Sequence, residues 1–327
     1  MMIISKTPLR ISLFGGGTDL PIYSNTYGGQ VVSFTINKYV YIMLNKRFDK
    51  GFRISYSKTE NIYKVKDIKH PIVRNALFKY NLESGIEIVS LADVPGQGSG
   101  LGSSSSFTVG LVNSIQTYLG VRSKKHELAQ DACDIEINML GGSAGRQDQY
   151  ASAYGGLNSI VFNSDESVNV EKISISKTNS QKLKKSMMLF YTKKTRAADK
   201  LLSEQTFNTV NSPSVKNNLH QIKGICSESL IHIQKANIEK LGALLDLSWS
   251  LKKTLSSKVS SDEIDYNYKV ALKYGAFGGK LLGAGGGGFM FLLAPPEKHR
   301  LIESKLGNWQ KFDFDFDHSG SKIISSK

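Results

Sequence analysis

The residues most clearly arranged for chemistry are the glycines and serines between Pro95 and Ser106, in the order Pro-Gly-Gln-Gly-Ser-Gly-Leu-Gly-Ser-Ser-Ser-Ser. Glycine keeps the backbone bare and permits positive φ, and serine offers an N-cap and free hydroxyls where a helix starts. Apolar residues then recur at helical spacing as far as Leu119, and Gly120 provides a stop, so the pattern predicts a helix over residues 103–119. Free N–H groups and the positive end of the helix dipole would converge on one glycine-lined concavity, which suits phosphate.

We interpret this segment as a phosphate cradle rather than a flexible linker, because linkers do not open directly onto a patterned helix. It is not a Walker A loop, since Ser103 rather than lysine follows Gly102, and its glycine spacing breaks the Rossmann fingerprint. A second glycine run at residues 283–288 precedes an apolar strand instead of a helix. The cradle residues predicted to bind nucleotide are Pro95, Gly96, Gln97, Gly98, Ser99, Gly100, Leu101, Gly102, Ser103, Ser104, Ser105 and Ser106.

The composition is that of an ordinary globular protein, with 327 residues, 40% of them hydrophobic and 21% charged, which is enough for two domains or one large one. No apolar run approaches the roughly 18 residues that a membrane span requires, and the first residues lack a signal-peptide pattern. Cys133 and Cys226 have no metal-ligand spacing and fit buried thiols in a reducing compartment. We therefore expect a cytoplasmic protein without a membrane partner.

The net charge of +14 favours an acidic partner, which could be a phosphorylated small molecule, a nucleotide or a nucleic acid. The lysines are spread along the chain, in pairs rather than in a block of five or more, so much of the charge belongs to a solvated surface. Nucleic acid is the least favoured of the three partners.

Strand and helix patterns follow one another in runs rather than alternating strictly. Apolar runs predict strands at residues 3–14, 31–45, 53–56, 86–91, 157–162, 187–191 and 289–293. Helical spacing predicts helices at residues 103–119, 123–140, 199–205, 215–234, 238–254, 264–274 and 297–306. The tail at residues 312–317 alternates Phe and Asp, so Phe should face a core and Asp should face water. This order indicates an α+β chain, with a domain boundary in the polar connection at residues 163–185.

Three glycine-rich segments carry a resemblance to a known family: residues 8–21, the cradle, and residues 278–289. In this order and with these sequences the chain resembles the GHMP small-molecule kinases, and the resemblance spans nearly its whole length. It implies ATP and Mg²⁺ as cofactors and two domains, with a fold like ribosomal protein S5 domain 2 over residues 1–175 and a ferredoxin-like fold over residues 176–327. The active site should lie between them.

Within that superfamily the chain looks most like the bacterial D-glycero-D-manno-heptose 7-phosphate kinases. The segments behind this are residues 14–21, 147–151 with 154–156, 195–196, 248–253 and 278–285. Galactokinases carry Gly-Glu-His-Thr-Asp where this chain has Gly-Gly-Gly-Thr-Asp, which argues against galactose as the substrate.

Asp148, in a glycine-rich stretch that reads as a loop, matches the segment that supplies the catalytic aspartate in the resembling family. Phosphoryl transfer to a sugar hydroxyl needs a carboxylate within hydrogen-bond reach of that hydroxyl. The resemblance places Arg10 beside it, where the arginine would keep the carboxylate ionised. Such a carboxylate is a weak base, so the expected role of Asp148 is orientation of the hydroxyl as much as proton abstraction. A turn-forming aspartate and a strand-end arginine are the structural alternatives.

Glu136 falls on the edge of the apolar face of the helix predicted at residues 123–140, where a carboxylate is costly without a cation or hydrogen bonds. The resemblance pairs a glutamate at this place with the second serine after Gly-Leu-Gly, which is Ser104, as ligands of magnesium. Two protein oxygens together with triphosphate and water suit that ion. A glutamate that extends into solvent is the alternative.

The remaining candidates concern the sugar substrate. Asp19, after the glycine turn, is the best acceptor for sugar hydroxyls, and Lys280 is as readily a structural residue as a functional one. A phosphate on the substrate would attract arginine, which can bind it through two hydrogen bonds. The substrate-binding candidates are Gly16, Gly17, Thr18, Asp19, Arg146, Thr195, Arg196, Lys253, Gly285 and Gly286.

The expected function is transfer of the γ-phosphate of ATP to the anomeric hydroxyl of the heptose 7-phosphate, giving the 1,7-bisphosphate for GDP-heptose, capsule or other surface-glycan precursors. The expected partner is a small phosphosugar. The alternatives are another sugar-1-kinase of fucokinase type, a non-catalytic sugar or nucleotide sensor on the same fold, and an RNA-binding protein, which lacks support from any aromatic and basic strip. The sequence does not indicate an oligomeric state.

Overall fold

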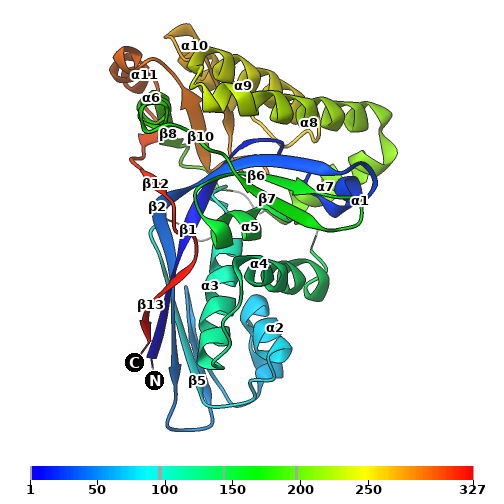
Figure 1. The fold of residues 1–327 in the computed structure, drawn as a ribbon, viewed down its shortest axis with the longest axis vertical. Helices are drawn as coiled ribbons and strands as arrows, with labels where there is room; N and C mark the ends of the chain where they lie inside the picture. Colours follow the sequence, from blue (N-terminus) through cyan, green and yellow to red (C-terminus); the bar gives the residue numbers. More distant parts are fainter. Residues whose placement is uncertain (1, 95–97, 143, 196–197, 327) are drawn as a thin grey trace.

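The long antiparallel pair β1 (Met2–Phe14) and β2 (Gly29–Lys46) forms the spine of the molecule (Figure 1). The structure is a computed structural model that describes residues 2–94, 98–142, 144–195 and 198–326. Burial alternates along the start of β1 and the end of β2, as at Ile3 and Ile42, whereas residues 7–14 and 31–36 are buried on both faces of the sheet. This alternation follows from the period of two in a strand, and it fixes the register of the pair against the core.

The larger sheet is completed on both sides of this spine. Strand β2 pairs with β5 (Ile86–Ala92) and β6 (Leu157–Phe162), and β5 continues to β3 (Phe52–Ser55) and β4 (Thr59–Ile62). Strand β7 (Val168–Lys172) extends β6, while the C-terminal strands β12 (Phe316–Asp317) and β13 (Lys322–Ser326) return to pair with β2 and β1. The end of the chain therefore rejoins its first strand.

Helices cover one side of this sheet (Figure 1). They are α2 (Pro71–Lys79), α3 (Ser103–Tyr118), α4 (Lys125–Cys133), a π-helix (Asp134–Met139) that continues α4, and α5 (Gln147–Tyr154). A short helix α1 (Pro21–Tyr27) follows the first glycine turn, and a 3₁₀ turn (Val65–Asp67) precedes α2. Helix α3 packs along β1 and β2, and the Arg10 N–H donates to the Leu101 carbonyl, so the N-terminus of α3 is held beside the middle of β1.

A second, four-stranded sheet has the order β11-β8-β10-β9, all antiparallel. Its strands are β8 (Met187–Tyr191), β9 (Gly278–Leu281), β10 (Phe289–Leu293) and β11 (Gln310–Lys311). The accompanying helices are α6 (Lys177–Ser186), α7 (Ala198–Asn211), α8 (Pro213–Gln234), α9 (Ile238–Lys253), α10 (Asp262–Lys273), a 3₁₀ turn (Pro296–Lys298) and α11 (His299–Lys305). The α+β prediction is confirmed, and the boundary at residues 175/176 stays a prediction.

Several predicted elements need correction. The predicted helix at residues 123–140 is α-helical only to Cys133 and then widens into the π-helix. The segment around Asp148 is not a loop, because Asp148 lies in the first turn of α5. The polar connection holds a strand and a helix, β7 and α6, and helices α1 and α2 were not predicted. In the tail Phe314 is buried as expected, but Asp317 is buried too, against the expectation for the Asp face.

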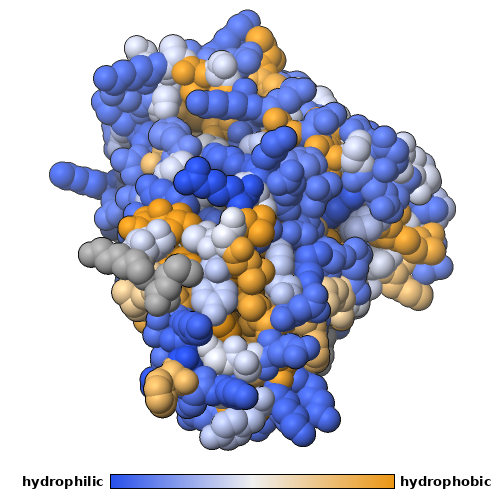
Figure 2. Space-filling view, turned by 60° about the horizontal axis from the view of Figure 1, so that its bottom comes forward, coloured by the Kyte–Doolittle hydropathy of each residue, from blue (hydrophilic) through white to orange (hydrophobic). Residues whose placement is uncertain are grey.

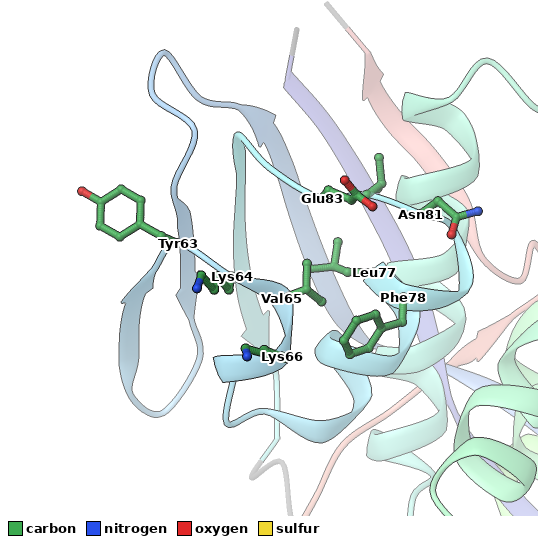
Figure 3. A pocket seen from close by; sticks show the side chains of 9 residues that line it. Tyr63, Lys64, Val65, Lys66, Leu77, Phe78, Asn81 and Glu83 are labelled. Atoms are coloured by element: carbon green, nitrogen blue, oxygen red, sulfur yellow. The ribbon is translucent and has the colours of Figure 1, made fainter.

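The face of the molecule seen in Figure 2 is mostly hydrophilic, with apolar patches between the polar side chains. Within the described ranges no helix combines the length and the apolar character that crossing a membrane requires. A shallow pocket of about 280 Å³ lies between the segment after β4 and the end of α2, where Val65 and Leu77 face each other and Lys64 and Lys66 lie at its edge (Figure 3). None of the predicted site residues lines it.

Two helix glycines give a matched test of the packing. A Cβ on Gly242 in α9 would overlap Phe277, whereas a Cβ on Gly224 in α8 would meet open space. We expect Gly242→Ala to destabilise the fold by about 1–3 kcal/mol through overpacking. Gly224→Ala should stabilise it by up to about 1 kcal/mol, because alanine is the better helix former. Urea unfolding measures both changes, and equal effects would contradict the close approach of α9 to Phe277.

Candidate active site

Two glycine-rich loops, at residues 98–102 and 283–288, meet backbone to backbone. A Cβ on Gly100 of the cradle would lie 2.5 Å from the Leu282 carbonyl oxygen, and one on Gly283 would lie 2.5 Å from the Gly100 Cα. Both glycines have positive φ, +77° and +71°, which other residues rarely adopt. Gly288 lies equally close to Ser99 and donates its N–H to the Lys194 carbonyl at 2.7 Å. The cradle is thus shaped by a loop almost 200 residues away in the chain.

The N-terminus of α3 opens at this meeting point. The prediction of a serine N-cap is wrong: the N-cap position is Gly102, with φ +76°, and no side chain caps the helix. The Ser103 hydroxyl instead lies 2.9 Å from that of Ser99, and Ser106 donates to the Pro8 carbonyl at 3.0 Å. An uncapped helix end beside a bare glycine loop leaves backbone N–H groups for an anion, so the described part of the cradle fits the phosphates of ATP. Pro95, Gly96 and Gln97 lie outside the described residues.

Arg10 and Asp148 form a bidentate ion pair beside the cradle. The Arg10 Nε donates to Asp148 Oδ1 at 2.7 Å and its Nη2 donates to Oδ2 at 2.6 Å. The Arg10 Nη1 also donates to the Gly100 carbonyl at 2.5 Å, and a Cβ on Gly102 would lie 3.3 Å from Asp148 Oδ2. Arg10 is 3% exposed, and the Asp148 side chain is 21% exposed, so the carboxylate keeps one accessible side next to the phosphate cradle.

Asp19 lies at the end of the first glycine turn, 2% exposed. It accepts hydrogen bonds from the Gly17 N–H at 2.9 Å and from the Gln147 Nε2 at 3.0 Å, so it is tied to the residue before Asp148. Burial raises the pKa of Asp19, and the nearby charge of Asp148 adds to that rise. Thr18, in contrast, is used to build the turn, because its hydroxyl donates to the Gly15 and Gln30 carbonyls.

Buried polar atoms without protein partners gather near this turn. Ser12 Oγ, Gln147 Oε1 and Gln205 Nε2 have no hydrogen-bond partner in the structure. A Cβ on Gly16 would lie 3.6 Å from Ser12 Oγ, and one on Gly17 would lie 2.7 Å from Gln205 Nε2. Since buried polar groups are normally paired, these atoms are suited to bind the hydroxyl groups of a small polar ligand.

Glu136 forms a buried cluster with two serines at the start of α3. Ser104 donates to its Oε1 at 2.8 Å, Ser105 donates to its Oε2 at 2.8 Å, and Gln149 donates to the same oxygen at 2.5 Å. Burial raises the pKa of Glu136, while these hydrogen bonds oppose the rise. A hydroxyl and a carboxylate beside the cradle are the oxygen ligands that Mg²⁺ prefers, so the donor set fits this ion. The π-helix positions Glu136, in keeping with the frequent occurrence of π segments at functional sites.

The structure does not bring all predicted phosphate-binding residues to this site. The Arg146 guanidinium donates to the Glu166 carbonyl, Ser24 Oγ and Asn25 Oδ1, which fixes the loop after β6 to α1. Lys253 pairs with Asp265 at 3.2 Å.

The other three substrate candidates described lie around the second glycine-rich loop. Thr195 is exposed and follows Lys194, which that loop contacts. Gly285 and Gly286 pack against Val259, with Gly286 N–H donating to its carbonyl at 2.9 Å. Arg196 lies outside the described residues.

Two lysines that the sequence interpretation did not assign lie in the site instead. Lys252 is 7% exposed and Lys280 is 3% exposed, and the charges of Arg10 and Asp19 act on both. Lys252 shares the inner face of α9 with Leu241, Leu245 and Ser248. Helical spacing from these residues would have placed Lys252, and not Lys253, on the buried face.

Comparisons with known proteins agree with this arrangement. The family described as GHMP kinases N terminal domain matches residues 65–156, and GHMP kinases C terminal matches residues 229–309. The D-glycero-alpha-D-manno-heptose 7-phosphate kinase of Campylobacter jejuni is 33% identical over 98% of both chains.

Two solved structures are similar in fold over almost the whole chain. A D-glycero-D-manno-heptose 1-phosphate kinase from Bacteroides thetaiotaomicron has a TM-score of 0.81 and 25% identity, with 99% of each chain covered. A putative sugar kinase from Campylobacter jejuni has a TM-score of 0.77 and 30% identity, with 98% of each chain covered. Together with the family matches, these findings show that the chain belongs to the GHMP kinase family and is a sugar kinase, a phosphotransferase with an alcohol group as acceptor.

Proposed function

We propose that this kinase transfers the γ-phosphoryl group of ATP to the anomeric hydroxyl of D-glycero-D-manno-heptose 7-phosphate and forms the 1,7-bisphosphate. The observation that carries the proposal is the Asp148 carboxylate, held by Arg10 against the phosphate cradle with one side accessible. The choice of sugar is supported by the two relatives named for heptose phosphates. We further propose that the enzyme is cytoplasmic and that its product supplies GDP-heptose for capsule or other surface glycans.

In the proposed reaction the hydroxyl oxygen of the sugar forms a bond to the γ-phosphorus. The bond from that phosphorus to the bridging oxygen breaks, and ADP leaves with this oxygen and the electron pair. The proton of the sugar hydroxyl passes to Asp148 and then to solvent. Arg10 fixes the direction of the Asp148 carboxylate through two hydrogen bonds, so Asp148 orients the hydroxyl as well as accepting its proton.

The other groups have supporting roles. Asp19 and the unpartnered atoms of Ser12, Gln147 and Gln205 would bind hydroxyl groups of the sugar. The N-terminus of α3 would bind the phosphates of ATP. Ser104 and Glu136 would hold Mg²⁺, which when bound offsets the negative charge of the triphosphate oxygens.

The catalytic role of Asp148 predicts a large loss of rate without it. Asp148→Asn should lower kcat by about two to four orders of magnitude, the range for general acid–base groups, while ATP still binds. Steady-state kinetics and calorimetric ATP titration measure the two quantities. Asp165→Asn, in an exposed turn, is the control and should leave kcat unchanged. A kcat for Asp148→Asn within a few-fold of the unmodified enzyme would contradict the assignment.

The proposed magnesium ligands predict a shift in metal dependence. Ser104→Ala and Glu136→Gln should each raise the Mg²⁺ concentration for half-maximal rate, because each removes or weakens one oxygen ligand. Thr117→Ala, at the other end of α3, should leave it unchanged. If both site variants titrate with Mg²⁺ as the unmodified enzyme does, the ligands lie elsewhere.

The phosphate on the proposed substrate predicts a selectivity. Two charge-assisted hydrogen bonds, each contributing about 1.5–3 kcal/mol, would make kcat/KM about two to four orders of magnitude larger for heptose 7-phosphate than for heptose. With Arg146 and Lys253 engaged elsewhere, Arg196 is the residue we propose for this contact, and Arg196→Ala should remove most of the preference. Equal turnover of the free sugar, measured at matched salt concentration, would place the enzyme with the free-sugar kinases.

A further inference from the structure

Two ammonium groups are buried in the site without a carboxylate partner. The Lys252 Nζ donates to the carbonyl oxygens of Gly283 and Leu281, and the Lys280 Nζ donates to that of Leu13 at 3.1 Å. Among the residues that the structure describes, neither lysine forms an ion pair. Buried lysines are normally paired, because a lone charge out of water is costly.

Basic side chains outnumber acidic side chains around these lysines. Arg10, Lys252 and Lys280 face Asp19 and Asp148, and the Arg10 guanidinium already takes both oxygens of Asp148. Asp19 is bound by the Gly17 N–H and by Gln147. With both lysines protonated, the three cations exceed the two carboxylates by one charge, and a bound anionic group would favour that protonated state.

The position of the lysines indicates which anion this is. Lys252 is bonded to Gly283, which touches Gly100 of the phosphate cradle. On the other side, the Lys280 Nζ lies 3.9 Å from the position of a Cβ on Gly16, in the turn that leads to Asp19. Lys252 is thus linked to the cradle and Lys280 lies beside the glycine turn that ends at Asp19, and the charge of Asp148 acts on Lys252. The phosphoryl group must cross between these two parts of the site.

We infer that Lys252 is a catalytic residue that contacts the oxygens of the phosphoryl group during its transfer, and that Lys280 adds positive charge behind it. The inference rests on the proposed phosphotransfer and holds for whichever sugar accepts the phosphoryl group. Positive charge fixed in a water-poor site stabilises the developing charge of the transition state without reorganisation.

The electrostatics of the cluster support this role and give it a pH signature. Burial, and after it the charge of Arg10, lowers the pKa of Lys252 to about 8, while Asp19 and Asp148 oppose the shift. Burial, together with Lys252 and Arg10, also places the pKa of Lys280 well below its ordinary value; Cys226 of α8 and Asp19 oppose that shift. The protonated form of Lys252 is the active one, so kcat/KM should fall tenfold per pH unit above about pH 8.

Bound polyphosphate favours the ammonium form and raises the pKa of Lys252. Binding at pH 8 should therefore take up protons from solution. Calorimetric titration with a non-hydrolysable ATP analogue, in two buffers of different ionisation enthalpy, measures this uptake independently of catalysis.

The test compares three variants with the best acceptor sugar found for the unmodified enzyme. Lys252→Met should lower kcat by about two to three orders of magnitude, the usual cost of losing one electrostatic contact to the transition state. Lys252→Arg keeps a cation that does not titrate in this range, so it should regain part of kcat, lose the fall of kcat/KM above pH 8 and take up fewer protons, with Lys280 as the remaining titrating amine. Lys240→Met, on the same helix at a surface ion pair with Glu228, should match the unmodified enzyme.

Each outcome decides one question. If the unmodified enzyme phosphorylates no sugar, the proposed function fails. If it does, and Lys252→Met keeps kcat within about threefold, the role of Lys252 is overturned. It is also overturned if Lys252→Arg retains the alkaline fall and the proton uptake. Should Lys252→Met not fold, as judged by its thermal melt, the pH profile and proton uptake of Lys252→Arg still decide.

Discussion

The site depends on one ion pair, between Arg10 at the core of β1 and Asp148 at the start of α5. Its two parallel hydrogen bonds fix both planar groups, and the third arginine nitrogen bonds to the Gly100 carbonyl. A strand, a helix and the phosphate cradle are therefore positioned by a single guanidinium. Removal of either partner would leave a mostly buried charge unpaired, which typically costs 3–5 kcal/mol.

The glycine turn that ends at Asp19 is coupled to the same ion pair through Gln147, the residue before Asp148. Gln147 precedes Asp148 and donates to Asp19, while Gly145 passes so close to the Asp19 carboxylate that a side chain there would overlap it. The start of α5 thus fixes the positions of both the Asp19 and the Asp148 carboxylates. The backbone of residues 145–148 therefore positions both carboxylates relative to each other, as a transfer between two bound substrates requires.

Much of this could be predicted from the sequence, because the signals were local. The glycines and serines before α3 predict a helix start, and the strands with alternating apolar residues are found where the pattern places them. Helix α5 was missed because only eight residues, flanked by glycines, form it, and its stability comes from packing against α3 and α4 rather than from propensity. The contacts of Arg146 could not be predicted for a related reason: its partners Ser24 and Asn25 are over a hundred residues away, and no spacing rule reveals them.

The interlocked glycines of the two loops also constrain how this enzyme can diverge. Gly100 and Gly283 leave no room for a methyl group on either side, so neither loop can gain a side chain unless the other loop moves. The shape of the phosphate cradle is consequently determined by two segments that are far apart in the chain. A chimaera that takes the cradle from one relative and the later loop from another combines two backbone segments whose shapes do not match at this close contact. Recombinants within this family should fold most readily when both loops come from the same relative.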